Sequence, residues 1–105
     1  MENNLDEKYL EDLVLHIAQS ISSYPDAARI ETKKDERGIL FIIHLSRGEE
    51  GKMIGREAVT INAIRHIVTC AGIERKIVAH VVVYSYRSVN WKYENRNVRD
   101  RDIYN

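Results

Sequence analysis

The sequence has one cysteine, one proline and no long apolar run, and each shortage excludes a class of protein. With Cys70 alone, neither an intrachain disulfide framework nor a thiolate metal cluster can form. No apolar segment approaches the roughly 20 residues that a membrane-spanning helix needs. The acidic start, MENNLDEKYLED, argues against a signal or transit peptide. These features predict a cytoplasmic protein with no membrane segment.

An excess of charge of one sign is also missing, because the formal net charge is zero. The charges are unevenly spread, however. Residues 1–36 carry nine acids and four bases, whereas residues 37–105 carry twelve bases and seven acids. A uniformly basic chain would indicate a polyanionic partner. This distribution allows a basic face without requiring one.

The 105 residues suffice for one domain and not for two with separate cores. We predict a domain over residues 1–87, with its core in residues 39–86, and a tail over residues 88–105. The tail combines arginines with aromatic residues, including Trp91. That composition fits a nucleic-acid-binding arm, a segment docked on the domain, or a flexible segment.

Hydrophobic periodicity predicts the order helix, strand, strand, short helix, long helix, strand. The ranges are 4–22 and 59–71 for the long helices, 28–33, 39–45 and 77–86 for the strands, and 48–55 for a segment with at most one helical turn. Gly72 is the expected C-cap of the second long helix. The order predicts an α+β fold, a three-stranded sheet with helices packed on one face.

The stretch MIGREAVTINAI, residues 53–64, places a glycine and a charged pair at the start of a helix. Gly55 allows a sharp turn and a close backbone approach. The helix presents its unpaired N–H groups and its positive dipole end to whatever lies at the loop, which favours a phosphate. Arg56 adds a guanidinium there, and Lys52 and Arg65 lie about one helical turn away. The pattern predicts a clamp for the backbone of single-stranded nucleic acid.

This stretch resembles the signature of the KH domain, V-I-G-x-x-G-x-x-I-x-x-I, through residues Met53, Ile54, Gly55, Ile61 and Ile64. The longer segment GKMIGREAVTINAIRHIV, together with the leading helix, the proline-containing link and the strand before the loop, is similar to the small stand-alone bacterial KH proteins of the KhpA type. The resemblance covers about residues 5–85. It implies a type II KH domain, α-β-β-α-α-β, that binds single-stranded RNA at the GxxG loop.

The resemblance also implies which residues contact RNA: Lys52, Ile54, Gly55, Arg56, Glu57, Ala58, Ile61 and Arg65. The two isoleucines are expected to line a groove for about four nucleotides, and the three basic side chains to meet phosphates. Pairing is implied as well, as a homodimer or as a heterodimer with a second KH-containing protein, with a role in RNA metabolism or cell-envelope control. No enzymatic activity, cofactor, metal or small-molecule substrate is expected.

The loop departs from the KH pattern at two positions. Ala58 stands where the pattern has its second glycine. If that position has helical φ/ψ, alanine is harmless and stabilises the helix start by up to about 1 kcal/mol. If a phosphate must approach its Cα closely, the methyl group obstructs it. Glu57 adds a carboxylate that repels phosphate. The alternative function is therefore a KH-fold protein–protein interaction module with weakened or lost nucleic-acid binding.

Three other groups of residues carry weaker signals. The four histidines fall on separate predicted elements without the spacing of a zinc site. Cys70 is expected to be a small buried residue and not a nucleophile. Glu49 and Glu50, which precede Gly51, are expected to cap the short helix.

Overall fold

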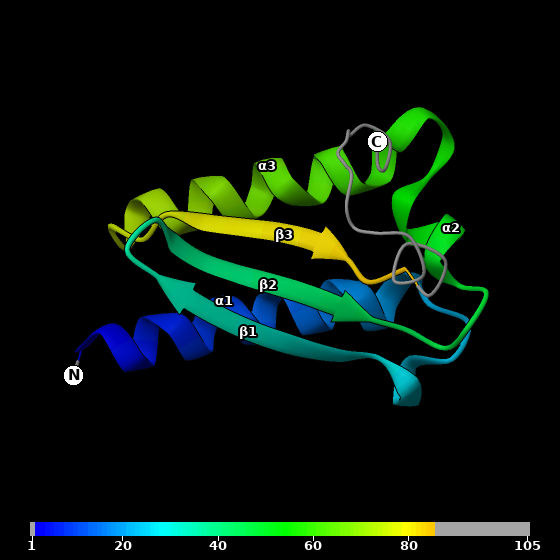
Figure 1. Cartoon of the computed structure of the whole chain (residues 1–105), viewed down its shortest axis with the longest axis horizontal. Coiled ribbons are helices and arrows are strands. Elements are labelled where there is room, and N and C mark those ends of the chain that lie inside the picture. The colour runs from blue at the N-terminus through cyan, green and yellow to red at the C-terminus, as the bar shows by residue number, and fades with distance from the viewer. Residues whose placement is uncertain (1, 86–105) are drawn as a thin grey trace.

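The computed structural model describes residues 2–85, and within them the elements follow the predicted order (Figure 1). The elements are α1 (Glu2–Ile21), η1 (Pro25–Ala27), β1 (Arg29–Asp35), β2 (Gly38–His44), α2 (Glu50–Ile54), η2 (Arg56–Ala58), α3 (Val59–Glu74) and β3 (Ala79–Val83). The predicted tail, residues 88–105, lies outside the described residues. None of the described helices is long and apolar enough to cross a membrane.

The three strands form one mixed sheet in the order β1-β2-β3. Strands β1 and β2 pair antiparallel through a tight turn, with Asp35 opposite Gly38. Strands β2 and β3 pair parallel, with Ile39 opposite Ala79. A parallel pair needs a long crossover connection. The chain supplies it with α2, the loop and α3, so the loop lies between two helices at one end of the sheet (Figure 1).

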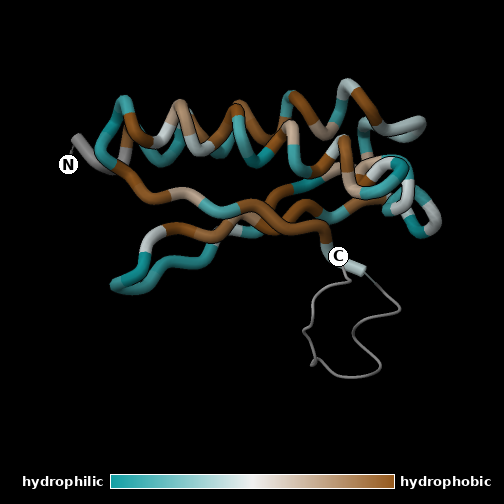
Figure 2. The backbone as a smooth tube through the Cα atoms, turned by 90° about the horizontal axis from the view of Figure 1, so that it is seen from above, coloured by the Kyte–Doolittle hydropathy of each residue, from teal (hydrophilic) through white to brown (hydrophobic). Residues whose placement is uncertain are grey.

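Both long helices cover the same face of the sheet, as Figure 2 shows. Alternate residues of β2 point into the layer between helices and sheet, and these are Ile39, Phe41 and Ile43. The helices present apolar residues at three- and four-residue spacing to the same layer, because that spacing places side chains on one face. The buried helical residues include Leu10, Val14, Ala18, Ile61, Ile64 and Val68.

Gly72 has a different role from the predicted one. Helix α3 continues past it to Glu74, and Arg75 follows as the C-cap. A Cβ on Gly72 would lie 2.5 Å from the carbonyl oxygen of Ile77. The glycine is therefore needed because the chain leading into β3 crosses the last turn of the helix at backbone contact distance. Its carbonyl accepts hydrogen bonds from the N–H groups of Arg75 (2.9 Å) and Ile77 (2.8 Å).

The opposite face of the sheet carries no element among residues 2–85. His44 Nε2 lies 2.8 Å from Glu31 Oε1, and the imidazole stacks on the Tyr84 ring at 4.6 Å between centroids. The hydrogen bond to His44 holds the pKa of the Glu31 carboxyl below its ordinary value. His80 pairs in register with Leu40, so the two strand histidines do not face each other. Within residues 2–85, no three His, Cys, Asp or Glu side chains gather as a metal site.

Candidate nucleic-acid interface

The loop between α2 and α3 is a sharp turn that depends on Gly55. This residue has φ 80° and ψ 168°, which is rarely adopted by a residue with a side chain. A Cβ there would lie 2.8 Å from Thr60 Cβ and 2.9 Å from the Thr60 nitrogen. The Gly55 N–H donates to the Gly51 carbonyl (2.8 Å), and the Gly55 carbonyl accepts from the Ala58 N–H (3.1 Å). The glycine therefore closes α2 and opens the turn into α3.

The start of α3 lies directly under this loop and is not capped by a side chain. Ala58 occupies the N-cap position of this 16-residue helix and makes no side-chain cap hydrogen bond. The first-turn N–H groups of a helix have no intrahelical acceptor and form the positive end of its dipole. Arg56 and Glu57 are exposed on the loop above them. The structure thus brings together a helix N-terminus and one guanidinium, with one carboxylate beside them.

Ala58 adopts the left-handed conformation, with φ 63° and ψ 22°. The first alternative stated for it, a harmless residue with helical φ/ψ, is therefore wrong. An L-residue in this region costs roughly 1–2 kcal/mol because its Cβ crowds the following carbonyl. Glu57 is left-handed as well, with φ 53°. The methyl group of Ala58 packs against the hydrophobic core, which offsets part of the strain at this position.

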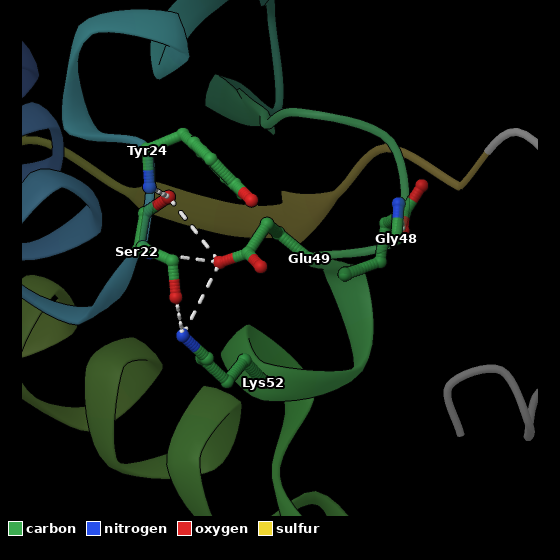
Figure 3. Close-up of polar contacts among 7 residues, drawn as sticks. Ser22, Tyr24, Gly48, Glu49 and Lys52 are labelled. Atoms are coloured by element: carbon green, nitrogen blue, oxygen red, sulfur yellow. Dashed lines mark hydrogen bonds and ion pairs between the residues drawn. The ribbon is translucent and has the colours of Figure 1, made fainter.

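Lys52 lies beside the loop, and its ammonium is engaged in a polar network (Figure 3). It forms an ion pair with Glu49 (3.4 Å) and donates a hydrogen bond to the Ser23 hydroxyl. The side chain remains 48% exposed, so it keeps surface on the solvent side. Lys52 is therefore placed near the predicted ligand but is partly neutralised by its own neighbour.

Glu49 is the centre of this network. The prediction that its side chain caps α2 is wrong, because the side chain makes no cap hydrogen bond there. Its carboxylate accepts instead from the Ser23 N–H (2.8 Å) and the Ser22 hydroxyl (3.5 Å), beyond the end of α1. The Ser23 N–H holds the pKa of the Glu49 carboxyl below its ordinary value, and Lys52 acts in the same direction. Glu49 thus ties the end of α1 to α2 and helps to position the loop.

The two isoleucines predicted to line the groove have different environments. Ile54, the last residue of α2, is half-buried and packs against the core while keeping some exposed surface. Ile61 is only 1% exposed. The prediction that Ile61 contacts RNA is not supported by this placement, because a fully buried side chain offers no surface to a ligand. Its role is to anchor the first turn of α3 to the sheet.

Arg65 lies two turns into α3 and reaches across to β3, away from the loop. Its Nε donates to the Val81 carbonyl (2.9 Å) and its Nη1 to Asn62 Oδ1 (3.2 Å). It borders a shallow hollow of about 290 Å³ between α3 and β3, lined also by Thr69, Ala79, His80, Val81 and Val82. The sequence contained no signal for this hollow, because it exists only where α3 packs beside β3.

The outer face of α3 is exposed and almost uncharged. Val59, Ile67 and Ile73 are 64%, 51% and 66% exposed. Cys70 is exposed on this face, which contradicts the prediction that it is buried. Its Sγ lies 4.0 Å from His66 Nε2, one turn earlier. Several exposed apolar side chains on one helix face are typical of interaction surfaces.

Comparisons with known proteins agree with this geometry. A family model described as "KhpA/KhpB, KH domain" matches residues 11–83. The RNA-binding protein KhpA of Bacillus subtilis (strain 168) is 31% identical over 68 residues, which cover 65% of this chain and 84% of that protein. The RNA-binding protein KhpA of Streptococcus pneumoniae serotype 4 is 33% identical over 73 residues, covering 70% and 92%. No solved structure gives a significant match.

Replacing Ala58 by glycine should stabilise the fold, because glycine adopts the left-handed conformation without strain. We expect Ala58→Gly to raise the free energy of unfolding by about 0.5–1 kcal/mol. This value is the strain that glycine relieves minus the contribution of the lost methyl contact. The matched control is Ala63→Gly, at an exposed position inside α3. This variant should lower the free energy of unfolding by about 1 kcal/mol. Urea unfolding followed by circular dichroism measures both. Destabilisation by both variants would contradict the left-handed assignment.

Glu49 should make stability depend on pH. Its folded-state pKa lies below the ordinary value of 4.5, so its stabilising effect is present above that pH and is lost as pH falls through the folded pKa. We expect the wild type to be more stable than Glu49→Gln at about pH 7, and we expect this difference to shrink as the pH is lowered below 4.5.

Urea midpoints measured across this pH range test the prediction. The matched control is Glu36→Gln, because Glu36 is an exposed residue of the β1–β2 turn. The urea midpoint of Glu36→Gln should stay close to that of the wild type at every pH measured. A Glu49→Gln difference that does not change with pH would show that the carboxylate charge has no part in holding α1 to α2.

Proposed function

The chain belongs to the KhpA/KhpB family of KH-domain proteins, and we propose that it binds single-stranded RNA, with the nucleic-acid backbone at the Gly55–Ala58 loop. Family membership confirms the predicted KH fold, and the mixed three-stranded sheet agrees with it. The two relatives described above are named as RNA-binding proteins. The family is defined by a KH domain and not by an enzymatic activity.

One observation carries the backbone contact: the Gly55 turn places the start of α3 and the exposed Arg56 at the same point. The helix N-terminus supplies N–H donors and positive dipole, and Arg56 supplies a full charge with planar donors. Lys52 adds a second cation that Glu49 partly neutralises. Glu57 opposes binding electrostatically, so we propose an affinity that depends mainly on Arg56.

The RNA bases would lie along the flank of α3 that faces β3. Ile54 offers apolar surface at the loop end of that flank. The hollow beside Arg65 continues along it toward the edge of the sheet. We therefore propose that Ile54 and the hollow contact bases, that Ile61 supports the helix from beneath, and that Arg65 lies too far from the loop to share its phosphate.

Short single-stranded RNAs titrated against variants test this function. We expect Arg56→Asp to weaken binding at least tenfold. It should also reduce the slope of log affinity against log salt concentration by about 1, as expected for the loss of one phosphate contact. Glu57→Gln should tighten binding a few-fold, because a repulsive charge is removed. Ala58→Gly should bind as tightly as the wild type or more tightly. Fluorescence anisotropy at two salt concentrations measures all four proteins.

Each contrary result has a specific meaning. No binding by the wild type at low salt would leave the alternative, a KH-fold interaction module without RNA affinity. Binding that Arg56→Asp leaves unchanged would move the RNA contact away from the loop. The Arg56 side chain is exposed, and the hydrogen bond that its residue accepts from the Val59 N–H is made by the backbone carbonyl, so Arg56→Asp is not expected to unfold the protein.

We also propose that α3 pairs with a second copy of this chain or with a second KH-containing protein. The outer face of α3 supports this, because Val59, Ile67 and Ile73 are all more than half exposed. Ile67 lies nearest the middle of the helix, where burial in an interface is most complete. This face points away from the β3 flank, so pairing and RNA binding would not compete.

Sedimentation measures this pairing. We expect Ile67→Lys to weaken self-association at least tenfold, because a charge at the centre of an apolar interface is left unpaired. The matched control is Leu5→Lys, at an apolar residue on α1 that is 75% exposed. It should leave association unchanged. A wild type that remains monomeric at high concentration would rule out the homodimer, and mixing with a second KH protein would then test the heterodimer.

Cytoplasmic location, the role in RNA metabolism or the cell envelope, and the function of residues 88–105 remain predictions from the sequence.

A further inference from the structure

The face of the sheet opposite the helices carries apolar side chains that the described part of the chain leaves partly exposed (Figure 2). Successive residues of a strand point to opposite faces. Leu40 and Ile42 therefore lie on this face, because the residues that alternate with them on β2 are buried under the helices. Val82 is paired in register with Ile42 and lies beside it. These three half-buried side chains lie outside the hydrophobic core, and we call them the apolar row.

Polar and aromatic side chains border the apolar row. On the β1 side, Glu31 is paired in register with Ile42, and Lys33 with Leu40. At the end of β3, the Tyr84 ring is stacked on the imidazole that follows the row along β2. An apolar patch with a polar rim is typical of an interaction surface. The row occupies two neighbouring strands, which lie about 5 Å apart, so its width matches one extended segment.

The residues that follow β3 contain a matching pattern. In the stretch VNWKYE, residues 89–94, apolar and polar residues alternate strictly. Alternation with a period of two indicates an extended segment with one apolar side. Val89, Trp91 and Tyr93 form that side, and the residues between them are polar. The segment therefore offers two large aromatic side chains and one valine to a single apolar surface.

Chain connectivity places this segment within reach of the apolar row. Tyr84 continues the ladder of β3, because its N–H donates to a carbonyl of β2 (2.9 Å). The four residues from Ser85 to Val89 span up to about 13 Å, which exceeds the strand spacing and lets the chain reverse its direction. Residues 89–93 in extended form then cover about 13 Å, the same length as residues 40–44 of β2.

We propose that residues 89–93 fold back over the open face of the sheet and cover the apolar row, with Val89, Trp91 and Tyr93 pointing toward it. The occupant belongs to the same chain, because a short tether gives it an effective concentration on the order of millimolar, which a free partner seldom reaches. This inference does not depend on RNA binding. It selects docking from the three roles that the composition of the tail allows.

Trp91 reports on docking directly, because it is the single tryptophan of the chain. We expect the full chain to show blue-shifted tryptophan emission and an acrylamide quenching constant about threefold lower than that of the urea-unfolded protein. Both values should be independent of protein concentration, because the segment and the row belong to one molecule.

Two variants test the alternation. Tyr93→Asp places a carboxylate against the apolar row, so it should shift the emission and the quenching constant to the values of the unfolded protein. The matched control is Asn90→Asp, which adds the same charge on the opposite side of the segment and should change neither value. Both substitutions lie outside the core of the domain, so their effect on Trp91 does not require the domain to unfold.

Nuclear Overhauser effects in the unmodified full chain locate the segment. We expect contacts between the Trp91 indole and the methyl groups of Leu40, Ile42 or Val82. Contacts with Ile67 instead would place the segment on the outer face of α3 and overturn the proposal.

Three fluorescence results would also overturn it. Emission equal to that of the unfolded protein would show that the segment is not docked. Shielding of Trp91 that rises with protein concentration would show a second copy as the occupant. Shielding that appears only after single-stranded RNA is added would show that the segment is a nucleic-acid-binding arm. None of these results bears on RNA binding at the loop, which Arg56→Asp tests separately.

Discussion

The packing of α3 against β2 and β3 is the contact on which the other parts of the site depend. Ile61, Ile64 and Val68 form its inner stripe and are buried against the sheet. Each such side chain contributes about 1.5–3 kcal/mol by leaving water. This burial fixes the rotation of α3 about its axis. The same rotation aims the flank with Arg65 at β3, turns Ile67 outward and holds the helix start under the loop.

Electrostatic interactions refine this arrangement locally. In the described part of the chain several cations near the surface have acidic partners, including Lys52 with Glu49 and Arg75 with Asp6. Exposed pairs of this kind add little to stability. The Lys52–Glu49 pair lies beside the loop, so it reduces the positive field there. The basic character of the site therefore comes from Arg56 and the α3 dipole, which agrees with a net charge of zero.

The loop that is proposed to contact RNA holds two of the three non-glycine residues with positive φ among the described residues. Gly55, Glu57 and Ala58 all have positive φ, and only the first is a glycine. The second glycine of the KH pattern has a physical reason in this geometry, because its position is left-handed. The strain at Ala58 persists because α2 is tied to α1 through Glu49 and α3 is packed on the sheet. Strained backbone held by a rigid surround is common at binding sites.

The sequence by itself determined the order of elements, the side of each long helix that faces the core, and the need for glycine at position 55. These follow from periodicity and from backbone conformation, which depend on residues within about one turn of each other. The tertiary structure decided the burial of Ile61, the pairing of Lys52, and the left-handed conformation of Ala58. It also decided the reach of Arg65 to Val81, 16 residues further along the chain. Contacts at that separation depend on how α3 stacks beside β3, and no local pattern in the sequence encodes that.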